Sequence, residues 1–175
     1  ARVLDLCCGS GCIACAVAKE LPATKLVAVD ISPSALQICR ENVALNRLNS
    51  RVLCLQADAL ASPPMGIGQF DVLVSNPPYI HREDHHLKEG DLRFEPENAL
   101  TDGADGLSAL AILVEGAPDY LKNGGWLLME HGYNQAEAVQ EMLVQREFTA
   151  VQNWRDLAGI GRVSGGCWRG QGNAG

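Results

Sequence analysis

Apolar, strand-like segments alternate with helix-like segments along most of this chain of 175 residues. Short runs rich in Val and Leu are followed by longer stretches with helical periodicity. Such repeated strand–helix units predict a mainly parallel sheet that is covered by helices on both faces. We expect strands at residues 2–7, 25–30, 51–55, 70–75, 126–130, 148–154 and 162–168, and helices at residues 12–21, 33–46, 108–121 and 135–146.

The last two expected strands are joined by a connection too short for a crossover helix, so they should pair antiparallel. The fold class is therefore α/β: a Rossmann-like, mainly parallel sheet of seven strands with an antiparallel C-terminal strand. A hydrophobic content of 47% is enough for one domain, which we place at residues 1–170, followed by a frayed tail at 171–175. Because the chain starts inside its first expected strand, we expect a fragment whose upstream region is missing.

Charge and composition indicate which classes of partner and which cellular compartment to expect for this protein. A net charge of −7 predicts no stable binding to nucleic acid. No apolar run approaches the ~20 residues of a membrane helix. Seven cysteines, an odd number that falls mostly in expected strands and helices, indicate reduced thiols in a cytoplasmic protein.

The tetrapeptide Asn76-Pro77-Pro78-Tyr79 follows the expected strand at residues 70–75. Ligands of open α/β sheets bind at the carboxyl ends of strands. The two prolines fix φ and remove backbone donors, so the segment presents carbonyl acceptors in a stiff frame. These acceptors and the aromatic ring suit a planar nitrogen substrate. The alternative is a Pro-Pro turn in which Asn and Tyr have turn and packing roles.

A loop with two glycines, Gly9 and Gly11, joins the first expected strand to the first helix. Glycine lets the backbone approach a ligand closely. Asp30, at the end of the second strand, can accept hydrogen bonds from both hydroxyls of a ribose, and Asp58 can accept one from an adenine amino group. Residues 9–14 also match the dinucleotide fingerprint loosely, so these residues alone leave NAD open. A third alternative is a purely structural turn in which Asp30 is a cap.

Asp5, the glycine loop, Asp30 and the tetrapeptide together resemble the class I fold of the S-adenosylmethionine-dependent methyltransferases. Further stretches resemble release-factor glutamine methyltransferases of the HemK/PrmC type, and this resemblance covers essentially the whole chain. The stretches are Arg93-Phe94-Glu95-Pro96-Glu97-Asn98-Ala99-Leu100, Asp105-Gly106-Leu107, Leu128-Met129-Glu130-His131-Gly132 and Arg155-Asp156-Leu157-Ala158-Gly159.

The resemblance implies S-adenosyl-L-methionine as cofactor and class-1 peptide chain release factors as partners. The implied reaction is N5-methylation of the glutamine in their Gly-Gly-Gln motif. In that family an upstream helical domain helps to hold the release factor. The implied cofactor contacts are Asp5, Cys7, Cys8, Gly9, Ser10, Gly11, Asp30, Asp58, Ala59 and Asn76; the implied substrate contacts are Asn76, Pro77, Pro78 and Tyr79, and no metal is implied.

Two positions depart from the family pattern. The family usually has glycine where Cys7 stands, and a cysteine is compatible with that place if its φ is negative and its Cβ points into the core. Ala59 stands where an aromatic residue is sometimes found, so stacking on adenine must come from another residue.

The candidate catalytic residues are Asn76, Pro77 and Tyr79. An amide nitrogen is nearly non-basic, because its lone pair is delocalised into the carbonyl. We expect the Asn76 side-chain oxygen and the Pro77 carbonyl each to accept one N–H of the substrate amide, and Tyr79 to hold the amide flat. Positioning of this kind removes the need for a general base.

Three other functions remain as alternatives. A ribosomal-protein glutamine methyltransferase would share the tetrapeptide, and a nucleic-acid exocyclic-amine methyltransferase would fit the same pocket. An NAD-dependent oxidoreductase or a non-catalytic nucleotide binder would leave the tetrapeptide unexplained. The stretches at 93–96 and 155–157 favour release factors, and the lack of a Lys/Arg stripe weighs against nucleic acid.

Several metal-like clusters have simpler interpretations. Cys12 and Cys15 lie one turn apart on an expected buried helix face, where cysteine behaves as a small apolar residue. His81, His85 and His86 are expected in a solvated loop, with zinc binding as the alternative. His131 is expected to pack near a strand end that faces the site, with a minor substrate role as the alternative.

Overall fold

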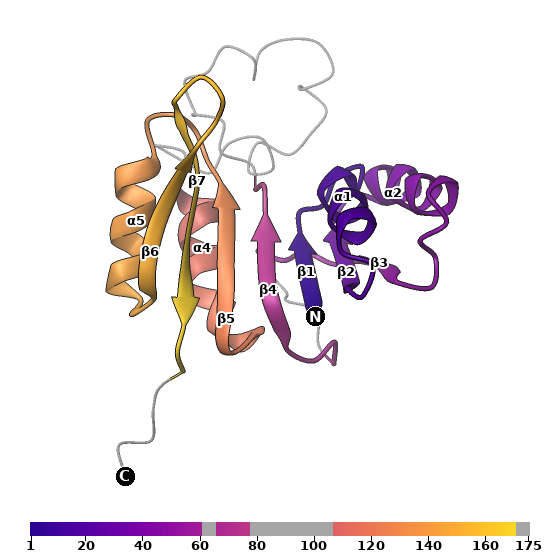
Figure 1. The fold of residues 1–175 in the computed structure, drawn as a ribbon, viewed down its shortest axis with the longest axis horizontal. Helices are drawn as coiled ribbons and strands as arrows, with labels where there is room; N and C mark the ends of the chain where they lie inside the picture. The colour runs from indigo at the N-terminus through magenta and orange to yellow at the C-terminus, as the bar shows by residue number, and fades with distance from the viewer. Residues whose placement is uncertain (61–65, 78–106, 171–175) are drawn as a thin grey trace.

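Seven strands form one sheet in the order β3-β2-β1-β4-β5-β7-β6 (Figure 1). The structure is a computed structural model that describes residues 1–60, 66–77 and 107–170. The strands are β1 (Arg2–Leu6), β2 (Lys25–Asp30), β3 (Val52–Gln56), β4 (Phe70–Ser75), β5 (Leu121–Glu130), β6 (Thr149–Arg155) and β7 (Gly161–Trp168). The helices are α1 (Cys12–Glu20), α2 (Pro33–Leu45), α4 (Ser108–Gly116) and α5 (Ala136–Gln145), with a 3₁₀ turn, η3, at Ala117–Asp119.

The sheet is mainly parallel. Parallel pairs join β1 to β2 and β4, β2 to β3, and β4 to β5. Strand β7 runs antiparallel between β5 and β6. The expected architecture, with its antiparallel C-terminal strand, is therefore confirmed.

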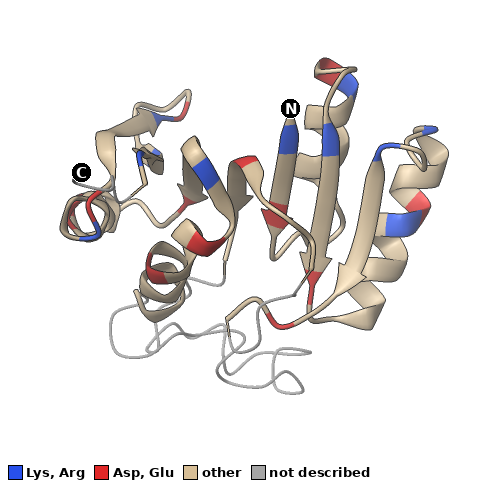
Figure 2. Cartoon of the chain, turned by 90° about the horizontal axis from the view of Figure 1, so that it is seen from below, with Lys and Arg blue, Asp and Glu red and all other residues tan. Residues whose placement is uncertain are grey.

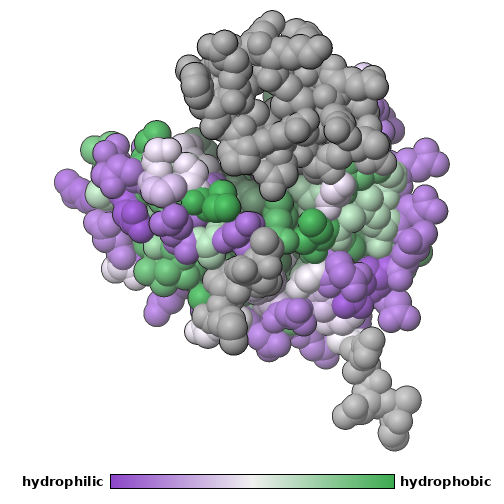
Figure 3. Space-filling view, turned by 180° about the vertical axis from the view of Figure 1, so that it is seen from behind, coloured by the Kyte–Doolittle hydropathy of each residue, from purple (hydrophilic) through white to green (hydrophobic). Residues whose placement is uncertain are grey.

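Helices cover both faces of the sheet, as expected (Figure 1). Helices α1 and α2 pack on one face around Leu26, Cys39 and Val43, while α4 and α5 pack on the other around Phe70 and Leu127. Seen from behind, the surface of the described residues mixes hydrophilic and apolar patches (Figure 3). No helix in the described part of the chain is long and apolar enough to cross a membrane.

Local signals explain where the first two helices begin and end. The Ser32 hydroxyl accepts a hydrogen bond from the backbone N–H of Ala35 at 3.2 Å, and Pro33 occupies the first helical position of α2. Ser32 is therefore the N-cap of α2, and proline is well suited to the position that follows it because its missing N–H has no partner to lose there. Helix α1 ends at Glu20, shortly before Pro22, which has no N–H to continue the helix.

The expected helix at 108–121 is too long. Helix α4 ends at Gly116, the 3₁₀ turn η3 contains Pro118, and β5 already begins at Leu121 instead of residue 126. Proline removes an α-helical hydrogen bond and clashes with the preceding turn, which favours the tighter 3₁₀ geometry. The early part of β5 contains Asn123-Gly124-Gly125, residue types that are typical of turns, and its register with β4 shifts between Phe70 and Val72.

The order of the strands creates a switch point between β1 and β4. From β1 the chain moves outward through β2 and β3, and from β4 it moves outward in the opposite direction through β5. Ligands of doubly wound sheets bind in the crevice beside the carboxyl ends of the strands at such a point. The candidate site therefore lies at the segments that follow β1, β2 and β4.

Candidate functional site

The loop after β1 is fastened to the end of β2. The Cys8 N–H donates to the Val29 carbonyl at 2.9 Å, and the Gly9 N–H donates to the Asp30 carboxylate at 2.8 Å. The other Asp30 oxygen accepts the Ser32 N–H at 2.9 Å. A carboxylate has about four lone-pair sites, so Asp30 keeps acceptor capacity for further donors such as ribose hydroxyls.

The two glycines of this loop have different reasons to be glycine. Both have positive φ, +56° at Gly9 and +81° at Gly11. A Cβ on Gly11 would lie 2.5 Å from the sulfur of Cys39 on α2, so the packing of α2 excludes a side chain there. A Cβ on Gly9 would meet nothing within 4 Å. The backbone at Gly9 therefore faces open space, as a close-approaching ligand requires.

Cys7 adopts the conformation that glycine would favour, with φ at +61°. The condition of a negative φ, under which a cysteine would be compatible with this position, is therefore not met. The half-buried thiol has its pKa raised to about 12, mainly by burial and next by the nearby carboxylate of Asp30, while a contact with Ser75 acts in the opposite direction. Cys7 is accordingly a protonated thiol at neutral pH.

Asp5 is a buried carboxyl group beside this loop. It lies inside β1 with no exposed surface, and neither of its carboxylate oxygens has a hydrogen-bond partner among the described residues. Burial raises its pKa to about 7; the Ala14 N–H counteracts part of this rise without satisfying either oxygen, and the charge of Asp30 adds to it. Beside the loop, the chain thus holds a buried carboxyl group whose two oxygens have no hydrogen-bond partner among the described residues.

Asp58 and Ala59 follow β3 and are both half-buried. One Asp58 oxygen accepts the Leu60 N–H at 3.0 Å, and Ala59 packs against the core on the α4 side of the sheet.

Sequence reasoning missed Ile31, which directly follows Asp30 and is 55% exposed. An exposed Ile beside a predicted ribose acceptor is a signal that could have identified it as an apolar surface for a base.

Asn76 and Pro77 lie directly beyond β4. Asn76 is exposed and Pro77 is buried, so the ring of Pro77 is anchored while the amide of Asn76 faces solvent. The Ser75 hydroxyl donates to the Leu6 carbonyl at 2.7 Å and ties the end of β4 to the end of β1. Pro78 and Tyr79 lie outside the described residues, as do the stretches at 80–100 and 105–106 and the histidines at 81, 85 and 86.

The structure also contains polar anchors that sequence reasoning missed. The Asn42 side-chain amide of α2 donates to the Ser10 carbonyl at 2.9 Å and fixes the loop from the helix side. The only hint in the sequence is an Asn inside a helix, where it is a poor helix former.

His131 is fully buried, with Nε2 2.8 Å from the Ser164 hydroxyl and Nδ1 2.9 Å from the Gly132 carbonyl. Its expected packing role is confirmed.

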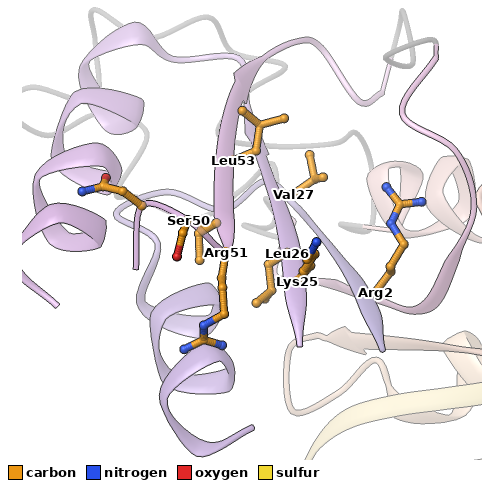
Figure 4. Close-up of a pocket in the computed structure, with 9 residues that line it drawn as sticks. Arg2, Lys25, Leu26, Val27, Ser50, Arg51 and Leu53 are labelled. Carbon is orange, nitrogen blue, oxygen red and sulfur yellow. The ribbon is translucent and has the colours of Figure 1, made fainter. Parts of the chain in front are cut away.

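Other possible sites carry less weight. Across the described ranges, no three His, Cys, Asp or Glu side chains are grouped so that they could hold a metal ion, and all seven cysteines are free. A cavity of about 230 Å³ opens at the amino edge of β1–β3, away from the loop (Figure 4). Two of its side chains, Arg2 and Arg51, are already bound to backbone carbonyls. These arginines have structural roles, so this cavity is a weaker candidate for the functional site than the carboxyl ends of the strands.

The strain at Cys7 can be measured by two matched substitutions. Cys7→Gly and Cys7→Ala both remove the thiol, but only Ala must keep a side chain at positive φ, which costs about 1 kcal/mol. We expect the free energy of unfolding, measured in urea, to be about 1 kcal/mol higher for Cys7→Gly than for Cys7→Ala. Equal stabilities, or a more stable Ala variant, would show that the loop does not hold this conformation.

Asp5 predicts a distinctive pH dependence of stability. The folded chain keeps the Asp5 proton up to a pKa of about 7, whereas the unfolded chain releases it near 3.8. The wild type therefore loses stability as the pH rises through this window, and Asp5→Asn does not. Urea unfolding should show that the stability gained by Asp5→Asn is about 2 to 3 kcal/mol larger at pH 8 than at pH 5. The same gain at both values would contradict a raised pKa.

Comparisons with known proteins agree with this geometry. The chain is 51% identical to the release factor glutamine methyltransferase of Bordetella pertussis over 165 residues, which cover 94% of this chain and 60% of that protein. It is 47% identical to the protein of the same name from Neisseria gonorrhoeae, over 93% of this chain and 59% of the relative. The chain thus spans about 60% of the length of these curated relatives.

The fold is also similar to solved structures. A methyltransferase from Pyrococcus furiosus superimposes with a TM-score of 0.69 at 20% identity, over 97% of this chain and 75% of that one. The fold is accordingly that of the class I methyltransferases. A family model described as "Methyltransferase small domain" matches residues 1–92. Because this match extends over more than half of its length, the chain belongs to the methyltransferase small domain family.

Proposed function

We propose that this chain is the catalytic domain of an S-adenosyl-L-methionine-dependent enzyme that methylates N5 of the glutamine in the Gly-Gly-Gln motif of class-1 peptide chain release factors. The carrying observation is that the glycine loop, Asp30 and the exposed Asn76 lie at one edge of the sheet, around its switch point. The names of the relatives from Bordetella pertussis and Neisseria gonorrhoeae support the choice of substrate. Because release factors act in translation, we also propose a cytoplasmic location.

The residues present fit the cofactor. Asp30 retains acceptor sites for ribose hydroxyls, and the open space at Gly9 allows close approach of the cofactor. Asp58 accepts from the adenine amino group, and Ile31 covers the adenine ring in place of an aromatic residue at 59. The buried carboxyl of Asp5 lies beside the same loop and has unsatisfied oxygens that can accept from a cationic donor. When bound, the cofactor supplies a methyl group attached to a positively charged sulfur.

Asn76 and Pro77 hold the acceptor. The Asn76 side-chain oxygen and the Pro77 carbonyl each accept one N–H of the substrate amide, which directs the nitrogen lone pair toward the methyl group. The buried Pro77 ring keeps these acceptors fixed, so little reorganisation is needed when positive charge develops on the nitrogen. Transfer would form the N–CH3 bond as the S–CH3 bond breaks, so that the sulfur would leave as a neutral thioether and one amide N–H proton would pass to water. Pro78 and Tyr79 complete the predicted pocket.

The alternatives are less well supported. A ribosomal-protein glutamine would suit the same pocket, but the two relatives are named for release factors. A nucleic-acid amine would call for a basic surface. Lys and Arg are interspersed with Asp and Glu along the part of the chain coloured in Figure 2, and the net charge is −7.

Replacement of Asn76 tests the proposed chemistry. Asn76→Ala removes one of two acceptors, and losing a single preorganised group of this kind costs about 10²- to 10³-fold in kcat. We expect this loss in a methyl-incorporation assay, with the dissociation constant of the cofactor changed less than about threefold in calorimetry, because Asn76 lies toward the substrate.

Two further variants control this measurement. Asn46→Ala removes an exposed amide at the end of α2 and should leave both quantities unchanged. Asn76→Asp keeps an oxygen acceptor but adds a negative charge. A parallel loss of cofactor binding and turnover in Asn76→Ala would refute the assignment of Asn76 to the substrate.

A further inference from the structure

The hairpin between β6 and β7 carries an apolar side chain that the proposed chemistry does not use. Leu157, in the turn of this hairpin, has a relative exposure of 110%, so its side chain contacts almost nothing in the chain. Trp154 and Ile160, on either side of the turn, are 40% and 37% exposed. The hairpin reaches past the carboxyl ends of β4 and β5 in Figure 1.

The turn is a preformed platform rather than a loose loop. One oxygen of the Asp156 side chain accepts the N–H groups of Ala158 at 2.9 Å and Ile160 at 3.0 Å. The Asp156 N–H donates to the Ile160 carbonyl at 2.8 Å, and the Arg162 guanidinium lies 3.4 Å from the second carboxylate oxygen. A side chain presented by such a turn loses little conformational freedom when a partner binds it.

The platform lies within reach of the proposed acceptor site. Asn76 follows Ser75, which pairs with Met129 on β5, and β5 in turn pairs with β7. With strands about 4.8 Å apart, β7 is roughly 10 Å from β4 across the sheet. A protein interface of standard size covers about 800 Å² on each partner, a disc of roughly 16 Å radius. The turn also lies along the strand direction, because Gly161, where β7 begins, is three residues or about 10 Å beyond Ser164, the partner of Met129. A disc of this size is about 32 Å across, so an interface that has Asn76 toward one side of it extends as far as the hairpin.

Charge indicates which surface fits the turn. Asp156 and Arg162 pair with each other. Arg155 is exposed, and within the described ranges its side chain makes no hydrogen bond or ion pair, although its backbone pairs with Gly161. The turn therefore offers a leucine beside an available cation, which complements an apolar recess with an acidic edge.

We propose that the β6–β7 turn is a docking arm for the protein that carries the acceptor amide, with Leu157 as its apolar anchor and Asp156 as the residue that positions it. This inference rests on the proposed function, which supplies a protein substrate. It adds a contact surface outside the acceptor pocket that distinguishes a whole protein from an isolated amide.

The test is the binding of a class-1 release factor to this chain by biolayer interferometry, alongside a methylation assay. Leu157→Ser should weaken binding tenfold or more, because burial of one leucine contributes about that much or more to affinity. Its cofactor affinity and melting temperature should not change, since Leu157 contacts nothing in the chain. The matched control is Leu45→Ser at the end of α2. Leu45 is 81% exposed and lies on the β3 side of the sheet, away from β6 and β7.

The positioning role of Asp156 has its own test. Asp156→Ala frees the turn and should weaken binding as Leu157→Ser does, whereas Asp156→Asn keeps the oxygen acceptor and should retain most of the affinity. Equal affinity of wild type and Leu157→Ser, or no binding by the wild type, would overturn the docking arm. If the wild type binds the release factor but does not methylate it, the proposed function is refuted. The effect of Leu157→Ser on binding can still be measured in that case.

Discussion

At the end of β2, the Asp30 carboxylate accepts hydrogen bonds from two backbone amides, those of Gly9 in the loop after β1 and Ser32 at the start of α2. This contact is possible only because β1 and β2 pair in parallel, so that both strands end at the same edge. Asp30 thereby sets the path of the loop, the start of the helix and the place of the proposed ribose contacts. Without this carboxylate the Gly9 amide would lose its partner and the loop its shape.

A second set of contacts does the same for the acceptor half of the site. Ser75 holds the end of β4 to Leu6, and the buried Pro77 fixes the backbone on the far side of Asn76. Asn76 is thus exposed between two anchored neighbours, which is the arrangement that a rigid hydrogen-bond acceptor requires. The β6–β7 hairpin extends beyond the same strand ends, so the proposed cofactor, acceptor and docking surfaces all lie at the carboxyl ends of the strands. The crevice between Arg2 and Arg51 lies at the amino ends.

Much of this arrangement could be predicted from the sequence, because its signals are local. Strand–helix alternation predicts the parallel sheet, Ser32-Pro33 marks the start of α2, and residues at strand ends converge at one edge whatever their separation in the chain. Features set by distant contacts could not be predicted. The positive φ of Cys7 follows from closure of its loop onto β2, and the raised pKa of Asp5 follows from complete burial. The hydrogen bond from Asn42 to Ser10 spans 32 positions in the sequence.

In the proposed reaction, this site methylates a glutamine amide of a release factor. Its most direct test is peptide mass spectrometry of a class-1 release factor after incubation with this chain and S-adenosyl-L-methionine. We expect a single added methyl group on the side chain of the glutamine in the Gly-Gly-Gln motif, and none when the cofactor is omitted. A methyl group on any other residue, or an unmodified release factor despite tight binding of cofactor and protein, would contradict it.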